Sequence, residues 1–302
     1  MNKVIISVDA GGSSTRTAII DYEKNILDVF KTGSGSPAVL NDEHLAFANI
    51  DEGLEKAYKK VKPELIVMGV SGIESVADRE KYVDYFQNKY NAKVLIENDA
   101  VIAVYSIVTD KYNEGILVLS GTGSAVMGIK DTKTRLIGGW GHILTEVGSA
   151  FTTVRDFFKS LILNYELGKE LTDLGKEFFK RYNLNRMEDI KLCVYPKTKK
   201  DIAKYASFIT EFADKGNPDA IALLKQGARD LARDVKNAYK ALNLSSDAVI
   251  GFRGGFVANA PILREELILI LSENGYNPRV VKGDENPLYG GYYLAKRKGL
   301  IC

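Results

Sequence analysis

Cysteine and histidine are almost missing from this chain of 302 residues. The two cysteines, Cys193 and Cys302, form no Cys-x-x-Cys pair, and the two histidines are His44 and His142. Two separated thiols cannot make a disulfide framework, and this set of residues does not make a zinc site. The sequence therefore argues against a disulfide-rich secreted domain and against a metal hydrolase built on histidines.

Long apolar runs and blocks of like charge are missing as well. The apolar stretch at residues 4–8 is too short for a signal-peptide core or a membrane span. The 41 basic and 39 acidic side chains leave a formal net charge of +2 and no basic patch for nucleic acid. We therefore expect a cytoplasmic protein that binds a small molecule, with neither nucleic acid nor a membrane as partner.

A strand, a glycine turn and a returning strand occur in the same order twice in the chain. The first copy has a buried strand at residues 4–8, a turn at Gly11-Gly12 and a second strand at 15–21, and residues 115–129 repeat this plan. A Walker loop or a Rossmann fingerprint would need a helix directly after the glycines. The repeat therefore predicts two copies of one α/β domain plan and disfavours both of those nucleotide folds.

The rest of the chain has mostly helical periodicity, which dominates after Gly148. The spacing predicts helices at 41–61, 78–89, 99–108, 150–163, 167–181, 199–215, 218–241 and 260–274, and further strands at 26–31, 65–70, 93–96, 134–137 and 248–252. We expect a first domain at 1–112 and a second at 113–302. The second domain would carry a helical insertion, and the last helix would pack back on the first domain.

Five motifs stand in a fixed order along the chain. They are Asp9-Ala-Gly-Gly-Ser-Ser-Thr-Arg, Asn98-Asp-Ala, Leu119-Ser-Gly-Thr-Gly-Ser, Gly138-Gly-Trp-Gly-His with Gly148-Ser-Ala, and Gly254-Gly-Phe. In this order they resemble the N-acetylglucosamine kinases within the BadF/BadG/BcrA/BcrD ATPase group, which belongs to the sugar kinase, Hsp70 and actin superfamily. The resemblance covers essentially the whole chain. It implies an α/β fold of two actin-like (ribonuclease H-like) domains and a homodimer.

The resemblance implies ATP and Mg²⁺ as cofactors. Glycine turns can point backbone N–H groups at phosphate because they permit a close approach. The residues it assigns to phosphates are Gly11, Gly12, Ser13 and Thr15 in a first loop and Gly121, Thr122 and Gly123 in a second, with Gly254 and Gly255 at the adenosine. Asp9 would lie near Mg²⁺ and hold it through water.

The resemblance also implies that Asp99 is the general base on the sugar hydroxyl. An aspartate at a helix N-terminus is expected to be held ionised by the helix dipole, so it can accept the O6 proton during phosphoryl transfer. The other residues assigned to the sugar are Ser36, Asn98, Ser124, Gly138, Gly139, Trp140 and Glu146. The flat ring of Trp140 would cover one face of the sugar.

Two positions depart from the family pattern. Glu146 stands where the family usually has the sugar-contacting aspartate, and Ser36 stands where it often has asparagine. Glutamate keeps the acceptor oxygens on a longer arm, and serine leaves more room. These departures affect the substrate more than the reaction, so N-acetylglucosamine is the first prediction and glucosamine and N-acetylmuramic acid are alternatives.

The sequence therefore predicts an ATP-dependent hexosamine kinase that phosphorylates O6. An ATPase that activates a dehydratase through an iron–sulfur cluster is an alternative, but Cys193 and Cys302 make a poor pair of cluster ligands. A sugar-responsive binding module is another, but it would be expected to have lost Asp99 and to carry an output domain.

Overall fold

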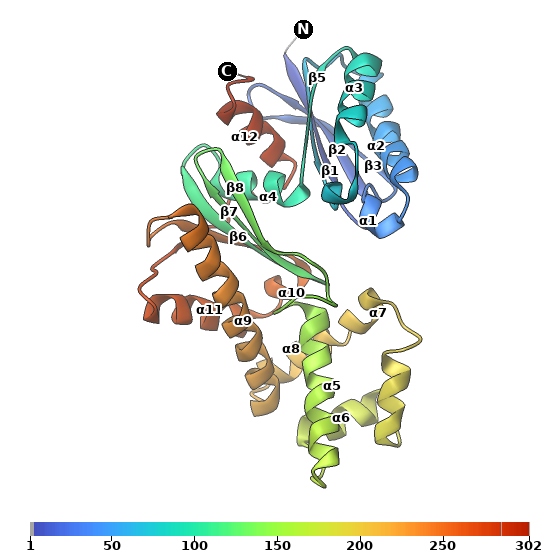
Figure 1. Ribbon diagram of the computed structural model, residues 1–302, viewed down its shortest axis with the longest axis vertical. Helices are drawn as coiled ribbons and strands as arrows, with labels where there is room; N and C mark the ends of the chain where they lie inside the picture. Colours follow the sequence, from blue (N-terminus) through green and yellow to red (C-terminus); the bar gives the residue numbers. More distant parts are fainter. Residues whose placement is uncertain (1–2, 285, 302) are drawn as a thin grey trace. The chain divides into compact units, whose positions relative to one another are not determined.

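The computed structural model describes residues 3–284 and 286–301, and it divides into two compact units (Figure 1). Unit 1 comprises Met1–Gly115, Ile129–Thr134 and Val281–Cys302, and unit 2 comprises Ile116–Gly128 and Arg135–Val280. The chain thus enters unit 2 twice and returns to unit 1 each time.

Unit 1 is built on a five-stranded sheet with the order β3-β2-β1-β4-β5. The strands are β1 (Val4–Ala10), β2 (Thr15–Asp21), β3 (Ile26–Thr32), β4 (Leu65–Val70) and β5 (Lys93–Glu97). β1 pairs antiparallel with β2 and parallel with β4, and β4 pairs parallel with β5. The first glycine turn therefore follows the carboxyl end of the central strand, at the same edge where β4 and β5 end.

Helices cover both faces of this sheet. They are α1 (Pro37–Leu40), α2 (Glu43–Tyr58), α3 (Arg79–Tyr90), α4 (Asp99–Val108) and α12 (Tyr289–Arg297), with a short 3₁₀ turn η1 (Ile73–Ser75). Figure 1 shows α2 and α3 on one side of the sheet and α4 and α12 on the other. The core under α2 and α3 includes Phe47, which stacks on Tyr82 with ring centroids 3.6 Å apart.

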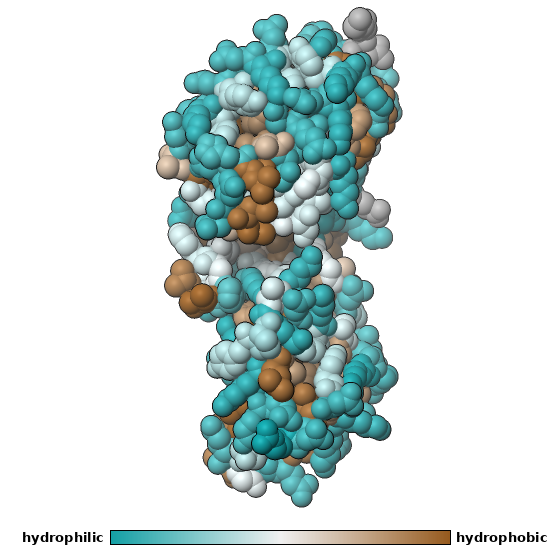
Figure 2. Space-filling view, turned by 90° about the vertical axis from the view of Figure 1, so that its right-hand side faces the viewer, coloured by the Kyte–Doolittle hydropathy of each residue, from teal (hydrophilic) through white to brown (hydrophobic). Residues whose placement is uncertain are grey.

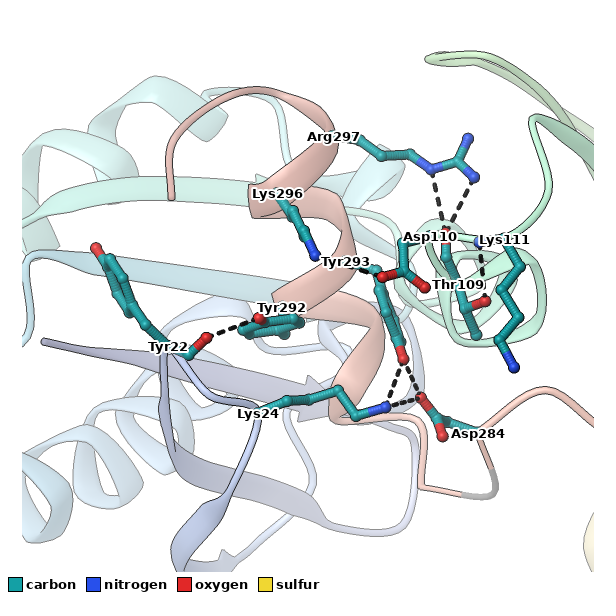
Figure 3. Close-up of polar contacts among 10 residues, drawn as sticks. All are labelled: Tyr22, Lys24, Thr109, Asp110, Lys111, Asp284, Tyr292, Tyr293, Lys296 and Arg297. Carbon is teal, nitrogen blue, oxygen red and sulfur yellow. Dashed lines mark hydrogen bonds and ion pairs between the residues drawn. The ribbon is translucent and has the colours of Figure 1, made fainter. Parts of the chain in front are cut away.

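Polar side chains tie α12 to the rest of unit 1 (Figure 3). The Tyr293 hydroxyl donates to Asp284 Oδ2 over 2.5 Å, and Lys24 Nζ donates to Asp284 and to Tyr293 at 3.2 and 2.7 Å. The hydrogen bond with Tyr293 is the largest cause of the raised pKa of Lys24. Arg297 donates to the Thr109 carbonyl just after α4. The Lys24 contacts tie α12 to the turn between β2 and β3, and the Arg297 contact ties it to the C-terminal end of α4.

Unit 2 repeats the plan of unit 1. Its strands are β6 (Glu114–Ser120), β7 (Ser124–Lys130), β8 (Lys133–Gly138), β9 (Val249–Arg253) and β10 (Arg279–Val280). The strand order in this sheet is β10-β9-β6-β7-β8. Read from its other edge it matches the first sheet, because β6 takes the central place of β1 and β7 and β8 take the places of β2 and β3. The α/β class and the repeat predicted from the glycine turns are both confirmed.

The helical insertion is confirmed, but two of its predicted helices are wrong in extent. The helices are α5 (Ala150–Glu166), α6 (Asp173–Arg181), η2 (Met187–Cys193, a 3₁₀ helix), α7 (Lys199–Ala203), α8 (Ala206–Asp214), α9 (Pro218–Leu242), α10 (Gly255–Ala258) and α11 (Pro261–Glu273). The helix predicted from residue 167 starts only at Asp173, because Gly168 is left-handed with a φ of 71° and Thr172 caps the next helix. The helix predicted at 199–215 is broken after Ala203.

The surface visible in Figure 2 is mostly hydrophilic, and its apolar side chains gather in small separate patches. In the described ranges, 3–284 and 286–301, no helix is both long and apolar enough to span a bilayer.

Candidate functional site

Asp99 begins α4 directly after β5, close to Asp9 at the end of β1. The parallel register sets Asp9, Gly69 and Glu97 side by side on three neighbouring strands. A Cβ on Gly69 would lie 3.2 Å from the Cα of Asp99 and 2.6 Å from the Ile102 side chain. Glycine at this place therefore lets α4 approach β4 and brings two carboxylates to one edge of the sheet.

Asn98, rather than Asp99, is the N-cap of α4. Its Oδ1 accepts the N–H of Ala100 at 2.8 Å, and its Nδ2 donates to Glu74 Oε1 at 2.8 Å. Asp99 Oδ1 also accepts the Ala100 N–H, at 2.9 Å. Since Asn98 already caps the helix, the need for a cap does not explain an aspartate at position 99.

The pKa of Asp99 is raised to about 6. Burial of its half-buried carboxyl group is the main cause and the charge of Asp9 adds to it, while hydrogen bonds from Ser71 and Ala100 act in the opposite direction. The start of a helix is expected to stabilise the ionised form and so to lower this pKa. Burial has the larger effect, and the pKa is raised. A carboxylate with a pKa near 6 is still mostly ionised at neutral pH, and it is a stronger base than an ordinary aspartate.

Asp9 is paired with Arg16 across the β1–β2 hairpin. Arg16 Nη2 donates to Asp9 Oδ2 over 2.6 Å, between residues that face each other in the antiparallel register. The described residues contain no group of three histidine, cysteine or acidic side chains that could hold a metal. Mg²⁺ keeps several waters and needs only one or two carboxylates when phosphates are present. Asp9 therefore fits a Mg²⁺ ion held through water.

The first glycine turn exposes backbone donors. The Gly11 N–H closes the turn on the Ser14 carbonyl at 3.1 Å. Within the described part of the chain, the N–H groups of Gly12 and Ser13 have no hydrogen-bond partner in the protein. Successive free N–H groups in a turn can bind an anion.

Two residues predicted to contact ligands near this turn point inward instead. The Thr15 N–H donates to the Gly33 carbonyl at 2.8 Å, and its hydroxyl is fully buried. Ser36 is 1% exposed, and its hydroxyl caps α1. The cap explains a serine at position 36, whereas the buried Thr15 hydroxyl has no hydrogen-bond partner among the described residues. The roles of both residues in binding stay predictions.

The predicted second phosphate loop and the predicted adenosine segment line one pocket in unit 2. The pocket has a volume of about 800 Å³, and Gly121, Thr122 and Gly255 line it together with residues of α7 and α8. Gly254 has a φ of 116°, and a Cβ there would collide with the Ser120 carbonyl. Glycine therefore lets the chain after β9 press against the end of β6. The fold thus brings together segments that are far apart in the sequence.

Glu146 lies beside Gly123 and is bound to a lysine that sequence reasoning missed. Its carboxylate is buried, with Oε1 accepting from Ser149 Oγ at 2.8 Å and Oε2 accepting from Lys199 Nζ at 2.6 Å. A Cβ on Gly123 would lie 2.8 Å from Glu146 Oε2 and 2.9 Å from Lys199 Nζ. The partners are 53 residues apart and Lys199 lies in the insertion, so no local pattern predicts the pair.

Trp140 is not a core residue. Its side chain is 72% exposed, and it follows two left-handed glycines, Gly138 and Gly139, whose φ angles are 73° and 76°. Ser124 at the start of β7 donates to the Val147 carbonyl in the same loop region. The loop therefore presents an aromatic face to solvent, as sugar stacking would require.

Cys193 is the cysteine in the part of the chain that the structure describes. Cys193 is buried, and burial raises the pKa of its thiol. Cys302 lies outside the described residues.

Comparison with known proteins gives the family. The sequence pattern of the BadF/BadG/BcrA/BcrD ATPase family matches residues 6–289. The chain belongs to this family. An N-acetylmuramic acid/N-acetylglucosamine kinase of Clostridium acetobutylicum is 28% identical over 304 residues, which cover 97% of this chain and 98% of that protein. Use of ATP is thus a property of the family, and the similarity to this kinase extends over nearly the full length of the chain.

Two crystal structures share the fold. A candidate N-acetylglucosamine kinase of Chromobacterium violaceum superposes with a TM-score of 0.71 at 18% identity, over 97% of this chain and 99% of that one. Another, from Porphyromonas gingivalis, has a TM-score of 0.71 at 19% identity, over 99% and 100%. The fold of this family member is that of two actin-like domains with a helical insertion in the second.

Proposed function

We propose that the protein is an ATP-dependent amino-sugar kinase that transfers the γ-phosphoryl group of ATP to O6 of N-acetylglucosamine, with N-acetylmuramic acid as a second substrate to be tested. The observation that carries this proposal is the carboxylate of Asp99, which has a pKa of about 6 and lies beside Asp9 without being needed as a cap. The kinase from Clostridium acetobutylicum supports the choice of the two sugars.

In this proposal Asp99 accepts the O6 proton while the bond from O6 to the γ-phosphorus forms and the bond to the β-phosphate oxygen breaks. The N–H groups of Gly12 and Ser13 in the first turn are suited to bind phosphate oxygens, and so, separately, are those of Thr122 and Gly123 in the second. When bound, Mg²⁺ neutralises charge on the phosphates, and Asp9 would hold it through water. A general base works best when its pKa lies near the working pH, so a raised pKa suits Asp99 for accepting the O6 proton.

The nucleotide would be held by the pocket of unit 2. Gly121, Thr122 and Gly255 line this pocket, and a volume of about 800 Å³ is in the range of cofactor sites. The exposed ring of Trp140 would stack on the sugar. A cytoplasmic homodimer stays our prediction, and light scattering of the purified protein checks its dimeric part.

The experiment that tests the function is ADP release from ATP with each of three sugars. N-acetylglucosamine, N-acetylmuramic acid and glucosamine are offered separately, and the position of the phosphate in the product is determined by NMR. We expect ADP release that depends on an N-acetylated sugar and a 6-phosphate product. ADP release that none of the three sugars stimulates would contradict the proposal.

A further inference from the structure

We propose that Lys199 binds an oxygen of the γ-phosphoryl group of the nucleotide, and that Glu146 is the positioning residue that holds Lys199 in place. This proposal rests on the proposed function, because it assigns the nucleotide phosphates to the turn at Gly121, Thr122 and Gly123. The proposal adds a positively charged side chain, that of Lys199, to the phosphate site, and none of the five sequence motifs contains this residue.

The first observation is the position of the Lys199 ammonium group. A Cβ on Gly123 would lie 2.9 Å from Nζ, so the nitrogen is in near contact with the backbone of the turn. The N–H groups of Thr122 and Gly123 have no protein partner in the described part of the chain. A phosphate bound by those N–H groups would meet the ammonium group at the same turn.

The second observation is that Lys199 has hydrogen-bonding capacity to spare. An ammonium group has three donors. Among the described residues the partner of Nζ is Glu146 Oε2, and the Phe151 ring faces it with a centroid 5.9 Å away. The side chain of Lys199 is 28% exposed, whereas that of Glu146 is 3% exposed. The lysine is therefore reachable from outside, and the carboxylate behind it is not.

The third observation is that folding alone does not explain this pair. A buried ion pair often contributes little net stability, because desolvation offsets the attraction. Both oxygens of Glu146 are occupied, by Ser149 Oγ and by Lys199 Nζ, so the carboxylate is fixed in orientation. A fixed acceptor behind a lysine restricts the lysine rotamers, and this lowers the entropy lost when the ammonium binds a ligand.

The nucleotide pocket points to a phosphate rather than to a sugar carboxylate as the ligand. Lys200 lines that pocket together with Gly121 and Thr122, and Lys199 directly precedes it as the first residue of α7. The turn therefore runs from the pocket at Gly121 to the ion pair at Gly123. A nucleotide in the pocket would extend its phosphates along the turn, and its last phosphoryl group would reach Lys199.

The test compares the affinity for ADP with the affinity for the non-hydrolysable β,γ-imido analogue of ATP, measured by calorimetry without sugar. Lys199→Met should weaken binding of the analogue about tenfold or more and leave ADP within about twofold, because only the analogue carries the third phosphate. Lys199→Arg should recover most of the loss. The matched control is Lys225→Met, which removes the 2.8 Å pair with Glu266 between α9 and α11.

Loss of a lysine next to a buried carboxylate can also weaken the fold. The double variant Glu146→Gln with Lys199→Met removes that carboxylate charge, and it should show the same selective loss for the analogue. Equal weakening of ADP and analogue, or no weakening of either, would overturn the proposal. A rise in KM for N-acetylmuramic acid alone would also overturn it, in favour of a sugar carboxylate as the ligand. Failure of the parent protein to phosphorylate any amino sugar would count against the proposed function, and the nucleotide comparison would still be readable.

Discussion

Replacing Asp99 with asparagine is expected to stabilise the folded protein at neutral pH while it removes the proposed base. Asparagine keeps the shape and the Oδ1 that accepts the Ala100 N–H, but it carries no charge. Folding raises the pKa of Asp99 from 3.8 to about 6. Each pKa unit of that change corresponds to about 1.4 kcal/mol in the free energy of unfolding of the ionised form. The ionised carboxylate therefore lowers the free energy of unfolding by at most about 3 kcal/mol, and partial solvation of the half-buried side chain reduces this to about 1–2 kcal/mol.

The sign of the effect follows from proton binding. Between about pH 4 and pH 6 the folded state binds more protons at Asp99 than the unfolded state does, because its pKa is raised. The contribution of Asp99 to stability therefore falls as pH rises through this window and is constant above it. Since the asparagine variant has no such titration, its advantage over the parent is small near pH 4 and complete near pH 7.

Urea unfolding of parent and variant at about pH 4.5, 5.5 and 7.5 measures this difference. Asp84→Asn, on the exposed side of α3, removes one carboxylate without burial and is the control. An Asp99→Asn protein that is less stable than the parent at pH 7.5 would refute the reasoning. A difference that is the same at all three pH values would refute it too, because burial of a charge predicts a pH dependence.

Three further substitutions test other parts of the structure. Gly290→Ala should lower the free energy of unfolding by about 1–3 kcal/mol in urea titrations, because a Cβ there would collide with the Ile102 carbonyl of α4; unchanged stability would contradict this packing. Cys193→Ala should keep kcat within about twofold at a stability cost of about 1 kcal/mol, whereas absorption near 400 nm in the parent, lost together with activity in a folded variant, would revive an iron–sulfur ATPase. Glu146→Gln should lower kcat/KM by a factor equivalent to about 1–3 kcal/mol for every sugar alike, since its carboxylate binds Lys199; a changed ranking of the sugars would mean direct sugar contact.

Local sequence signals predicted the elements that depend on local interactions. The start of α4 was predicted at Asp99 because a polar pair follows an apolar strand, and the observed helix begins there. The helix predicted from residue 167 is wrong: the apolar spacing runs through residues 167–181, but the left-handed Gly168 stops one helix and the Thr172 cap starts the next. The short edge strand β10 has only two residues and no periodicity to recognise.

The sequence predicts the turns of the candidate site, but it does not predict the contacts that tertiary packing makes there. Motifs identified the glycine turns, and the fold brings Gly121 and Gly255 to one pocket. The pair of Glu146 with Lys199 depends on how the insertion folds back beside the turn at Gly123, which no local pattern encodes. The pKa of Asp99 depends on burial and on the neighbouring Asp9, both of which are set by tertiary packing. The hydrogen bond from the Ala100 N–H at the helix start lowers this pKa by less than burial raises it.

The dependence of kcat/KM on pH for N-acetylglucosamine, in the parent and in Asp99→Asn, tests the central claim most directly. The parent rate should rise about tenfold per pH unit up to about pH 6 and level off above it, because Asp99 accepts the proton only when it is ionised. Asp99→Asn should be slower by roughly 10²–10⁴ and should lack this rise. A variant within about threefold of the parent, or one that keeps the same rise near pH 6, would contradict the assignment of Asp99 as the base.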